Sequence, residues 1–262
     1  MTPVPPVYKL GLKLAGPKPK LLFGTYFKAP DSPPVPTRFG RPWLIKPGAW
    51  GTLGNDDVGD CVWAGAAHET MMFSADVGGS VDFNTAGVLS DYSAVTGYVV
   101  GDDATDQGTD MRDAAVYRQK TGIVDSSGQR HKVDVYADIR TADLNQLALA
   151  TYLLGAVGVG VMFTDVAMAQ FNNGDVWDIK SRMKEAKNLG GHYIPCIGRN
   201  SANNFLFVSW GRLQAATPAW VRHQMDSGIA YLSRERLSAQ GLSPQGFNLA
   251  QLNDDLAQIT GS

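Results

Sequence analysis

Cysteine and histidine are scarce in this 262-residue chain, which has only two cysteines and four histidines. At most one disulfide can form, and the histidines show none of the paired spacings that are typical of zinc sites. We therefore expect no disulfide framework, no metal and no other cofactor. So few cysteines also indicate synthesis in a reducing compartment such as the cytoplasm.

Long apolar runs and an excess of charge of one sign are also absent. No segment reaches 18 uninterrupted apolar residues, and the start lacks the compact apolar stretch of a secretory signal. The 23 basic and 25 acidic residues give a net charge of −2. We therefore predict no membrane span, no signal peptide and no nucleic-acid partner. The hydrophobic content of 44% is enough for the core of one sizeable or bilobed domain.

Proline is rare except at the start, where residues 1–47 hold 11 of the 14 prolines. These residues include eight basic and one acidic side chain, a charge of +7 that leaves −9 on the remainder. Because frequent prolines favour extended backbone, we predict a basic arm over 1–36. Its role is left open between a solvated tail, a linker, a prosegment along the acidic body and a strap that binds an assembly partner. Aromatic residues such as Tyr8 and Phe23 fit anchors in a protein groove better than nucleic-acid contacts.

Cys61 stands at the start of a predicted helix. Asp60 is a favoured N-cap residue, and residues 61–75 contain no proline and a single glycine, Gly65. A helix N-terminus lowers the pKa of a thiol and offers amide donors to an oxyanion, although nearby acidic residues such as Asp60 oppose thiolate formation. The pattern fits a nucleophile, and it also fits a small buried cysteine.

His192 lies 131 residues after Cys61, at the start of a predicted strand. A hairpin loop over 200–204 connects it to a second predicted strand that ends in Ser209-Trp210-Gly211. Other motifs in the chain are Gln107-Gly108-Thr109, Val157-Gly158-Val159-Gly160-Val161, a turn over Phe171–Trp177, and Gly228-Ile229-Ala230-Tyr231-Leu232. In their order and spacing these motifs resemble the papain-like cysteine peptidases over about residues 38–236.

The resemblance implies an α+β, two-lobed papain-like fold. A helical N-terminal lobe would hold the central helix with Cys61, a C-terminal lobe of antiparallel strands would hold His192, and the active site would lie between them. The implied function is that of a cysteine endopeptidase, or a related acyl-transfer enzyme, with a peptide or protein substrate. Asn55 would join Cys61 and His192 in catalysis as an oxyanion donor. The implied substrate-binding residues are Gln107, Gly108, Gly191 and Trp210.

Two positions depart from the pattern of the family. Asn55 replaces a glutamine, and Val208 stands where an asparagine orients the histidine. Because valine cannot accept the ring N–H, another group has to do so. The candidates are Asn203, Asn204, Ser209 and a water. This departure keeps a second hypothesis open: a papain-like fold of little or no activity that serves as a structural component of a large assembly, such as a phage particle, anchored by its arm.

Periodicity predicts helices over 61–75, 110–121 and 141–154, and strands over 157–163, 192–199, 205–210 and 229–233. We interpret His68 as a core or surface histidine, and the acidic run 101–106 as a solvated loop instead of a calcium site. Leu249, Leu252, Leu256 and Ile259 follow helical spacing. The predicted organisation is an arm over 1–36, a papain-like domain over 37–236 and a C-terminal helical extension over 237–262.

Overall fold

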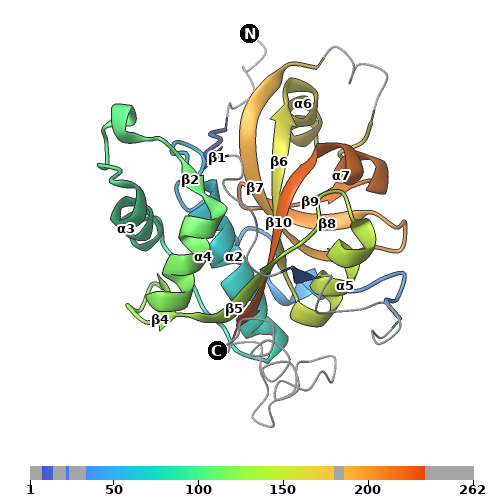
Figure 1. Cartoon of the computed structure of the whole chain (residues 1–262), viewed down its shortest axis with the longest axis horizontal. Helices are drawn as coiled ribbons and strands as arrows, with labels where there is room; N and C mark the ends of the chain where they lie inside the picture. Colours follow the sequence, from blue (N-terminus) through green and yellow to red (C-terminus); the bar gives the residue numbers. More distant parts are fainter. Residues whose placement is uncertain (1–7, 14–21, 24–33, 180–185, 234–262) are drawn as a thin grey trace.

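The structure is a computed structural model in which residues 8–13, 22–23, 34–179 and 186–233 are described (Figure 1). Most of the predicted arm and all of the predicted extension over 237–262 lie outside these ranges. The described helices are α2 (Cys61–Asp76), α3 (Thr85–Thr96), α4 (Met111–Lys120), α5 (Leu144–Leu154), α6 (Asp165–Asn173) and α7 (Pro218–Gln224), with short 3-10 helices η2 (Pro42–Leu44) and η3 (Asp103–Thr105). The described strands are β1 (Leu12–Lys13), β2 (Thr109–Asp110), β3 (Ile123–Val124), β4 (Arg130–His131), β5 (Val133–Asp138), β6 (Val157–Thr164), β7 (Asn188–Arg199), β8 (Phe205–Ser209), β9 (Arg212–Ala216) and β10 (Met225–Ser233).

One sheet of eight strands connects the two halves of the molecule. Its order is β2-β1-β7-β6-β10-β5, and β8 and β9 extend it from β7. Every pairing in it is antiparallel except that of β1 with β2, which is parallel. Figure 1 shows α2, α3 and α4 on the left and α5, α6 and α7 on the right, and each group packs on its own buried apolar cluster. The α+β class and the two-lobed arrangement are thus confirmed.

The central helix α2 is buried from Cys61 to Ser74. Gly65 faces the ring of Tyr193 in β7, and a Cβ added to Gly65 would lie 2.5 Å from that ring. Only a residue without a side chain permits this approach. The contact fixes the first turns of α2 against the strand that carries His192.

A buried polar cluster joins the same elements further along α2. Glu69 forms an ion pair with Arg118 of α4 and accepts a hydrogen bond of 2.6 Å from the hydroxyl of Tyr193. The Arg118 guanidinium lies over the Tyr231 ring of β10, 3.9 Å from its centroid. Both charges are fully buried, so the loss of either one would leave the other uncompensated in the core. The cluster therefore holds α2, α4, β7 and β10 together.

The predicted helices are confirmed as α2, α4 and α5, and the predicted strands as β6, β7, β8 and β10. β8 ends at Ser209, one residue early, because Trp210 (φ 44°) and Gly211 (φ 72°) form a two-residue turn into β9. The turn predicted over Phe171–Trp177 is wrong in its first part, which belongs to α6; the helix ends at Gly174 in the left-handed conformation. α3, α6, α7, β5 and β9 are additional to the predicted elements.

The described pieces of the arm contact the body of the protein. β1 lies inside the sheet between β2 and β7. Leu22 forms a bridge with Asp138 of β5, and the adjacent Phe23 is 1% exposed within the cluster beneath α5. Phe23 therefore belongs to the core of this chain instead of a groove in another protein. Truncation of the whole arm would remove part of that core.

Candidate active site

Cys61 is the first residue of α2 and is 1% exposed. The backbone amides of Tyr193 in β7 and of Gly11 next to β1 hydrogen-bond its sulfur. Burial raises the pKa of the thiol to about 12, and the two amides offset the rise only in part. In this form of the protein the thiol is therefore neutral at pH 7.

His192 immediately precedes Tyr193 in β7, so its main chain lies beside the Cys61 sulfur. Its Nε2 shares a hydrogen bond of 2.9 Å with Ser209 Oγ, and its Nδ1 has no hydrogen-bond partner among the described residues. The ring of Trp210 stacks on the imidazole, with 4.1 Å between centroids. Burial lowers the pKa of His192 to about 3, so the imidazole is also neutral at pH 7.

Ser209 provides the hydrogen-bond partner for His192 that Val208 cannot provide. Val208 is 1% exposed and packs in the apolar cluster beneath α2, away from the histidine. The next residue along β8 presents its hydroxyl to the imidazole instead. Of the four candidates for orienting His192, Ser209 is the one in contact with it.

The loop before α2 differs from expectation in two ways. Asn55 is buried, but its Nδ2 already donates to the carbonyl oxygen of Val58 at 3.0 Å. Asp60 precedes the helix without forming the predicted side-chain cap bond. Burial raises the pKa of Asp60 well above its usual value, and Asp106 and Asp56 add to the rise. The charge of Asp60 contributes to the raised pKa of Cys61, so this residue opposes thiolate formation as the sequence suggests.

Residues Tyr8–Lys13, which we call the strap, fill the seam between β2 and β7. Leu12 pairs with Thr109 of β2 on one side and with Gly191 of β7 on the other. The Thr109 N–H donates to the carbonyl oxygen of Gly11 at 2.7 Å. Since Gly11 also hydrogen-bonds the sulfur of Cys61, the strap runs directly over the thiol.

Glycines line the contact between the strap and the seam. A Cβ on Gly11 would lie 1.7 Å from the carbonyl oxygen of Gly59, and one on Gly108 would lie 2.1 Å from that of Gly11. A Cβ on Gly191 would lie 2.3 Å from the carbonyl oxygen of Leu12. Main chain thus packs on main chain, which other residues would prevent. Gly108 and Gly191, expected to bind substrate, both contact the strap.

Trp210 covers the other end of the strap. Tyr8 stacks on its ring at 4.8 Å, and the Trp210 Nε1 donates to the carbonyl oxygen of Lys9 at 3.2 Å. Gln107, by contrast, is exposed, and its side-chain amide donates to the carbonyl oxygen of Ala104 within its own turn. Of the four predicted substrate-binding residues, Gly108, Gly191 and Trp210 contact the strap, whereas Gln107 bonds within its own turn.

Sequence reasoning missed two polar residues beside the strap. Asp106 accepts hydrogen bonds from the Gly59 N–H (2.8 Å) and from the Tyr92 hydroxyl (2.6 Å). The interpretation of 101–106 as a solvated loop is therefore wrong for Asp106. Its partners lie 47 and 14 residues away in the sequence, and no local motif connects them.

The other predicted features do not contribute to this site. His68 is a core histidine whose Nε2 lies 3.0 Å from the carbonyl oxygens of Trp50 and Gly51, and burial lowers its pKa to about 4. Both cysteines are free and buried. Within the described ranges, no group of three or more acidic, histidine or cysteine side chains is arranged to hold a metal. None of the described helices is long and apolar enough to span a membrane.

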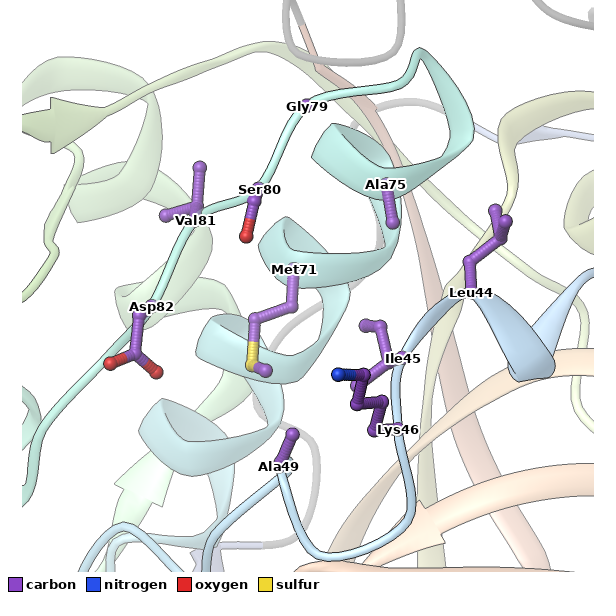
Figure 2. Close-up of a pocket in the computed structure, with 10 residues that line it drawn as sticks. All are labelled: Leu44, Ile45, Lys46, Ala49, Met71, Ala75, Gly79, Ser80, Val81 and Asp82. Atoms are coloured by element: carbon purple, nitrogen blue, oxygen red, sulfur yellow. The ribbon is translucent and has the colours of Figure 1, made fainter.

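A pocket of about 320 Å³ opens at the far end of α2 (Figure 2). Met71 and Ala75 of α2 line one side, and Ile45 and Lys46 line the other. Neither Cys61 nor His192 contributes to it. The pocket is therefore separate from the candidate active site.

Comparison with known proteins identifies the fold. No family model matches the chain, and no curated protein matches its sequence. Its structure is similar to xylellain, a cysteine protease from Xylella fastidiosa, with a TM-score of 0.65 and 13% identity over 88% of this chain and 98% of that one. It is also similar to procathepsin B from Trypanosoma congolense (TM-score 0.58, 11% identity, 86% and 87% covered) and to procathepsin L 3 from the larval midgut of Tenebrio molitor (0.55, 15%, 79% and 72%). The chain therefore has the fold of the papain-like cysteine proteases.

Proposed function

We propose that the chain is a papain-type cysteine peptidase that its own strap holds in a latent form. The observation that carries the proposal is an extended peptide, Tyr8–Lys13, hydrogen-bonded through its main chain in a seam of this fold, directly over Cys61. A seam that binds one extended peptide through its backbone is suited to bind another as a substrate.

Once the strap leaves, the residues around Cys61 have the chemistry for acyl transfer. His192 Nδ1 would take the thiol proton, so Nε2 has to carry the ring hydrogen and donate it to Ser209 Oγ. The thiolate would attack a peptide carbonyl, and the backbone amide of Cys61 would bind the oxyanion, assisted by Asn55 after it releases Val58. His192 would then protonate the leaving amine.

The direction of the strap explains why it would block the enzyme without being cut. A leaving amine must lie on the side of His192 and Trp210 to receive its proton, so the N-terminal part of a substrate lies along β2. The strap runs the opposite way, with Tyr8 at Trp210 and Leu12 at β2. Its direction is therefore the reverse of a cleavable peptide.

Burial also keeps Cys61 and His192 uncharged. The pKa of Cys61 is raised to about 12 and that of His192 is lowered to about 3, in both cases chiefly by burial. Between these values the thiol keeps its proton and the imidazole accepts none. Removal of the strap would admit water and move both pKa values back toward neutrality, which favours the thiolate–imidazolium pair.

A second candidate is an inactive papain-like component of a larger assembly, anchored by its arm. The engagement of the Asn55 amide with Val58 and the absence of an asparagine at position 208 favour this alternative. Under it, the thiol of Cys61 has no assistance from His192 even when the strap is displaced.

The variant Gly11→Asp separates these functions, because its side chain would clash with the carbonyl oxygen of Gly59 and expel the strap. We expect a peptidyl fluoromethyl ketone to label Cys61 in this variant at pH 7 about a hundredfold faster than in the wild type. Adding His192→Ala should lower the rate again by about a hundredfold, the usual contribution of a general base. Mass spectrometry of the labelled peptides measures both rates.

Cys196 serves as the internal control, since it lies buried in the opposite apolar cluster and reports unfolding. Its labelling should stay slow in every variant. Equal labelling of Cys61 in Gly11→Asp with and without His192 would reject the peptidase proposal and support the assembly component.

A further inference from the structure

Three hydrogen bonds connect the loop before Cys61 to the edge strand β2. The Gly59 N–H donates to Asp106 Oδ2 at 2.8 Å, and the Tyr92 hydroxyl donates to Asp106 Oδ1 at 2.6 Å. The Gly108 N–H in turn donates to the Tyr92 oxygen at 2.9 Å. Tyr92 is fully buried in α3 and its bond with Gly108 is buried, whereas the two bonds to Asp106 are partly buried.

The direction of these bonds decides which amide faces the strap. Because Asp106 accepts the hydroxyl hydrogen of Tyr92, the Tyr92 oxygen is left to accept from Gly108. Gly108, with φ at +68°, turns its N–H inward to that oxygen. The next amide, that of Thr109, then points to the strap and donates to Gly11. Tyr92 therefore sets the orientation of the donor that binds a peptide in the seam.

The same network sets the distance between this donor and the thiol. Asp106 holds Gly59, two residues before Cys61. A second tie supports the arrangement, because Trp63 Nε1 in the first turn of α2 donates to Thr109 Oγ1 at 2.9 Å. A peptide bound by the Thr109 amide is thus held at a fixed distance from the Cys61 sulfur.

We infer that Asp106 and Tyr92 are positioning residues that hold the Cys61 loop and the peptide-binding amide of Thr109 in register. As far as catalysis is concerned, the inference rests on the proposed peptidase function. The role of Asp106 and Tyr92 in holding a bound strand does not depend on that function, since the strap itself is bound by the Thr109 amide.

Strap opening in the otherwise wild-type chain provides the first test. Tyr92→Phe and Asp106→Asn should each speed the labelling of Cys61 by iodoacetamide about tenfold or more, because the first removes the hydroxyl that joins Asp106 to Gly108 and the second replaces one of the two acceptor oxygens of Asp106 by a donor. Tyr98→Phe, on the ring adjacent to Tyr92, and Asp103→Asn, in the same acidic turn, are matched controls and should keep the wild-type rate. Labelling of Cys196 should not change. No acceleration at Cys61, or a parallel one at Cys196, would overturn the inference.

The second test uses the strap-released Gly11→Asp chain and a peptidyl fluoromethyl ketone. Tyr92→Phe should raise the inhibition constant about tenfold and leave the inactivation rate of the bound complex and the iodoacetamide rate within about twofold. Asp106→Asn should also slow inactivation, because it frees Gly59. A uniform change in all three constants would indicate a merely structural role and overturn the inference. If the Gly11→Asp parent shows no His192-dependent labelling, the peptidase proposal fails, and the first test still decides whether the two residues hold a strand.

Discussion

Ser209 is the residue whose side chain hydrogen-bonds His192. The Ser209 hydroxyl shares a hydrogen bond of 2.9 Å with Nε2 of the imidazole, and Trp210 stacks on one face of the ring. The hydroxyl is smaller and less directional than a carboxamide, and it rotates about one bond. The resulting orientation should therefore be weaker than in a Cys-His-Asn site but sufficient to select one tautomer.

In the strap-released chain, Ser209→Ala should lower the rate of Cys61 labelling by a peptidyl probe about ten- to a hundredfold, as expected for loss of the group that orients a base. The buried Nε2 would then lack its partner. Ser201→Ala, in the exposed 200–204 hairpin, is the matched control and should have no effect. An unchanged rate in Ser209→Ala would show that another group orients His192.

The crossing of α2 over β7 is the element-scale feature that brings Cys61 next to the His192 strand. Gly65 and Tyr193 form its closest contact, and Glu69 fastens the helix one turn further on. The position of the Cys61 thiol is thus set by the contact of Gly65, which has no side chain, with the Tyr193 ring. Substitutions here should act on stability and on the site together.

Gly65→Ala should reduce the free energy of unfolding by about 1–3 kcal/mol, because the added methyl overlaps the Tyr193 ring and forces the helix or the ring to move. Urea denaturation followed by circular dichroism measures the change. Gly87→Ala in α3 is the control: its Cβ would lie 3.2 Å from a Val124 methyl, and the gain in helix propensity offsets that contact. Equal stability of Gly65→Ala and wild type would contradict the proposed close contact.

Regular periodicity and the two-residue spacing of apolar side chains made the long elements predictable. α5 starts at the capping residue Asp143, and β6 alternates valine and glycine over its first five residues. The hairpin at Trp210-Gly211 was unpredictable because a tryptophan at positive φ contradicts local propensity and is stabilised by its stacking on His192. The hydrogen bond between Ser209 and His192 depends on the position of that turn in the sequence.

The network around Asp106 illustrates a second limit of sequence reasoning. Its carboxylate lies in a run of acidic residues that are otherwise exposed, and composition favours a solvated loop. Its partners come from α3 and from the loop before α2, so only the tertiary fold identifies them. Cys61, His192 and Trp210 were identifiable because they lie in motifs with recognisable spacing.

For the whole molecule, the arm has two kinds of contact that differ in purpose. Phe23 is part of the apolar core, whereas the strap occupies the seam over Cys61. The first contact contributes stability, and the second, under the proposed function, controls access to Cys61. Removal of residues 1–36 would abolish both at once, so point variants distinguish them better than truncation.

Phe23→Ala should lower the free energy of unfolding by about 3–5 kcal/mol, the usual cost of emptying a buried phenylalanine site. Gly11→Asp should change it less, because Phe23 keeps its place in the core and only the strap side chains, chiefly the buried Leu12, lose their apolar contacts. Denaturant titrations of both variants, with Cys61 labelling measured in parallel, check this division. Loss of stability in Gly11→Asp comparable to that of Phe23→Ala would show that the strap is also a structural element.

The anchored Phe23 has one more effect on the strap. Only the eight residues 14–21 separate Lys13 from Leu22, so a displaced strap stays near its seat at an effective concentration of about a millimolar. A free peptide at micromolar concentration loses that competition by about a thousandfold even when its intrinsic affinity is equal. Under the proposed peptidase function, the onset of activity therefore requires an event that severs or captures this connection, and a rise in substrate alone does not trigger it.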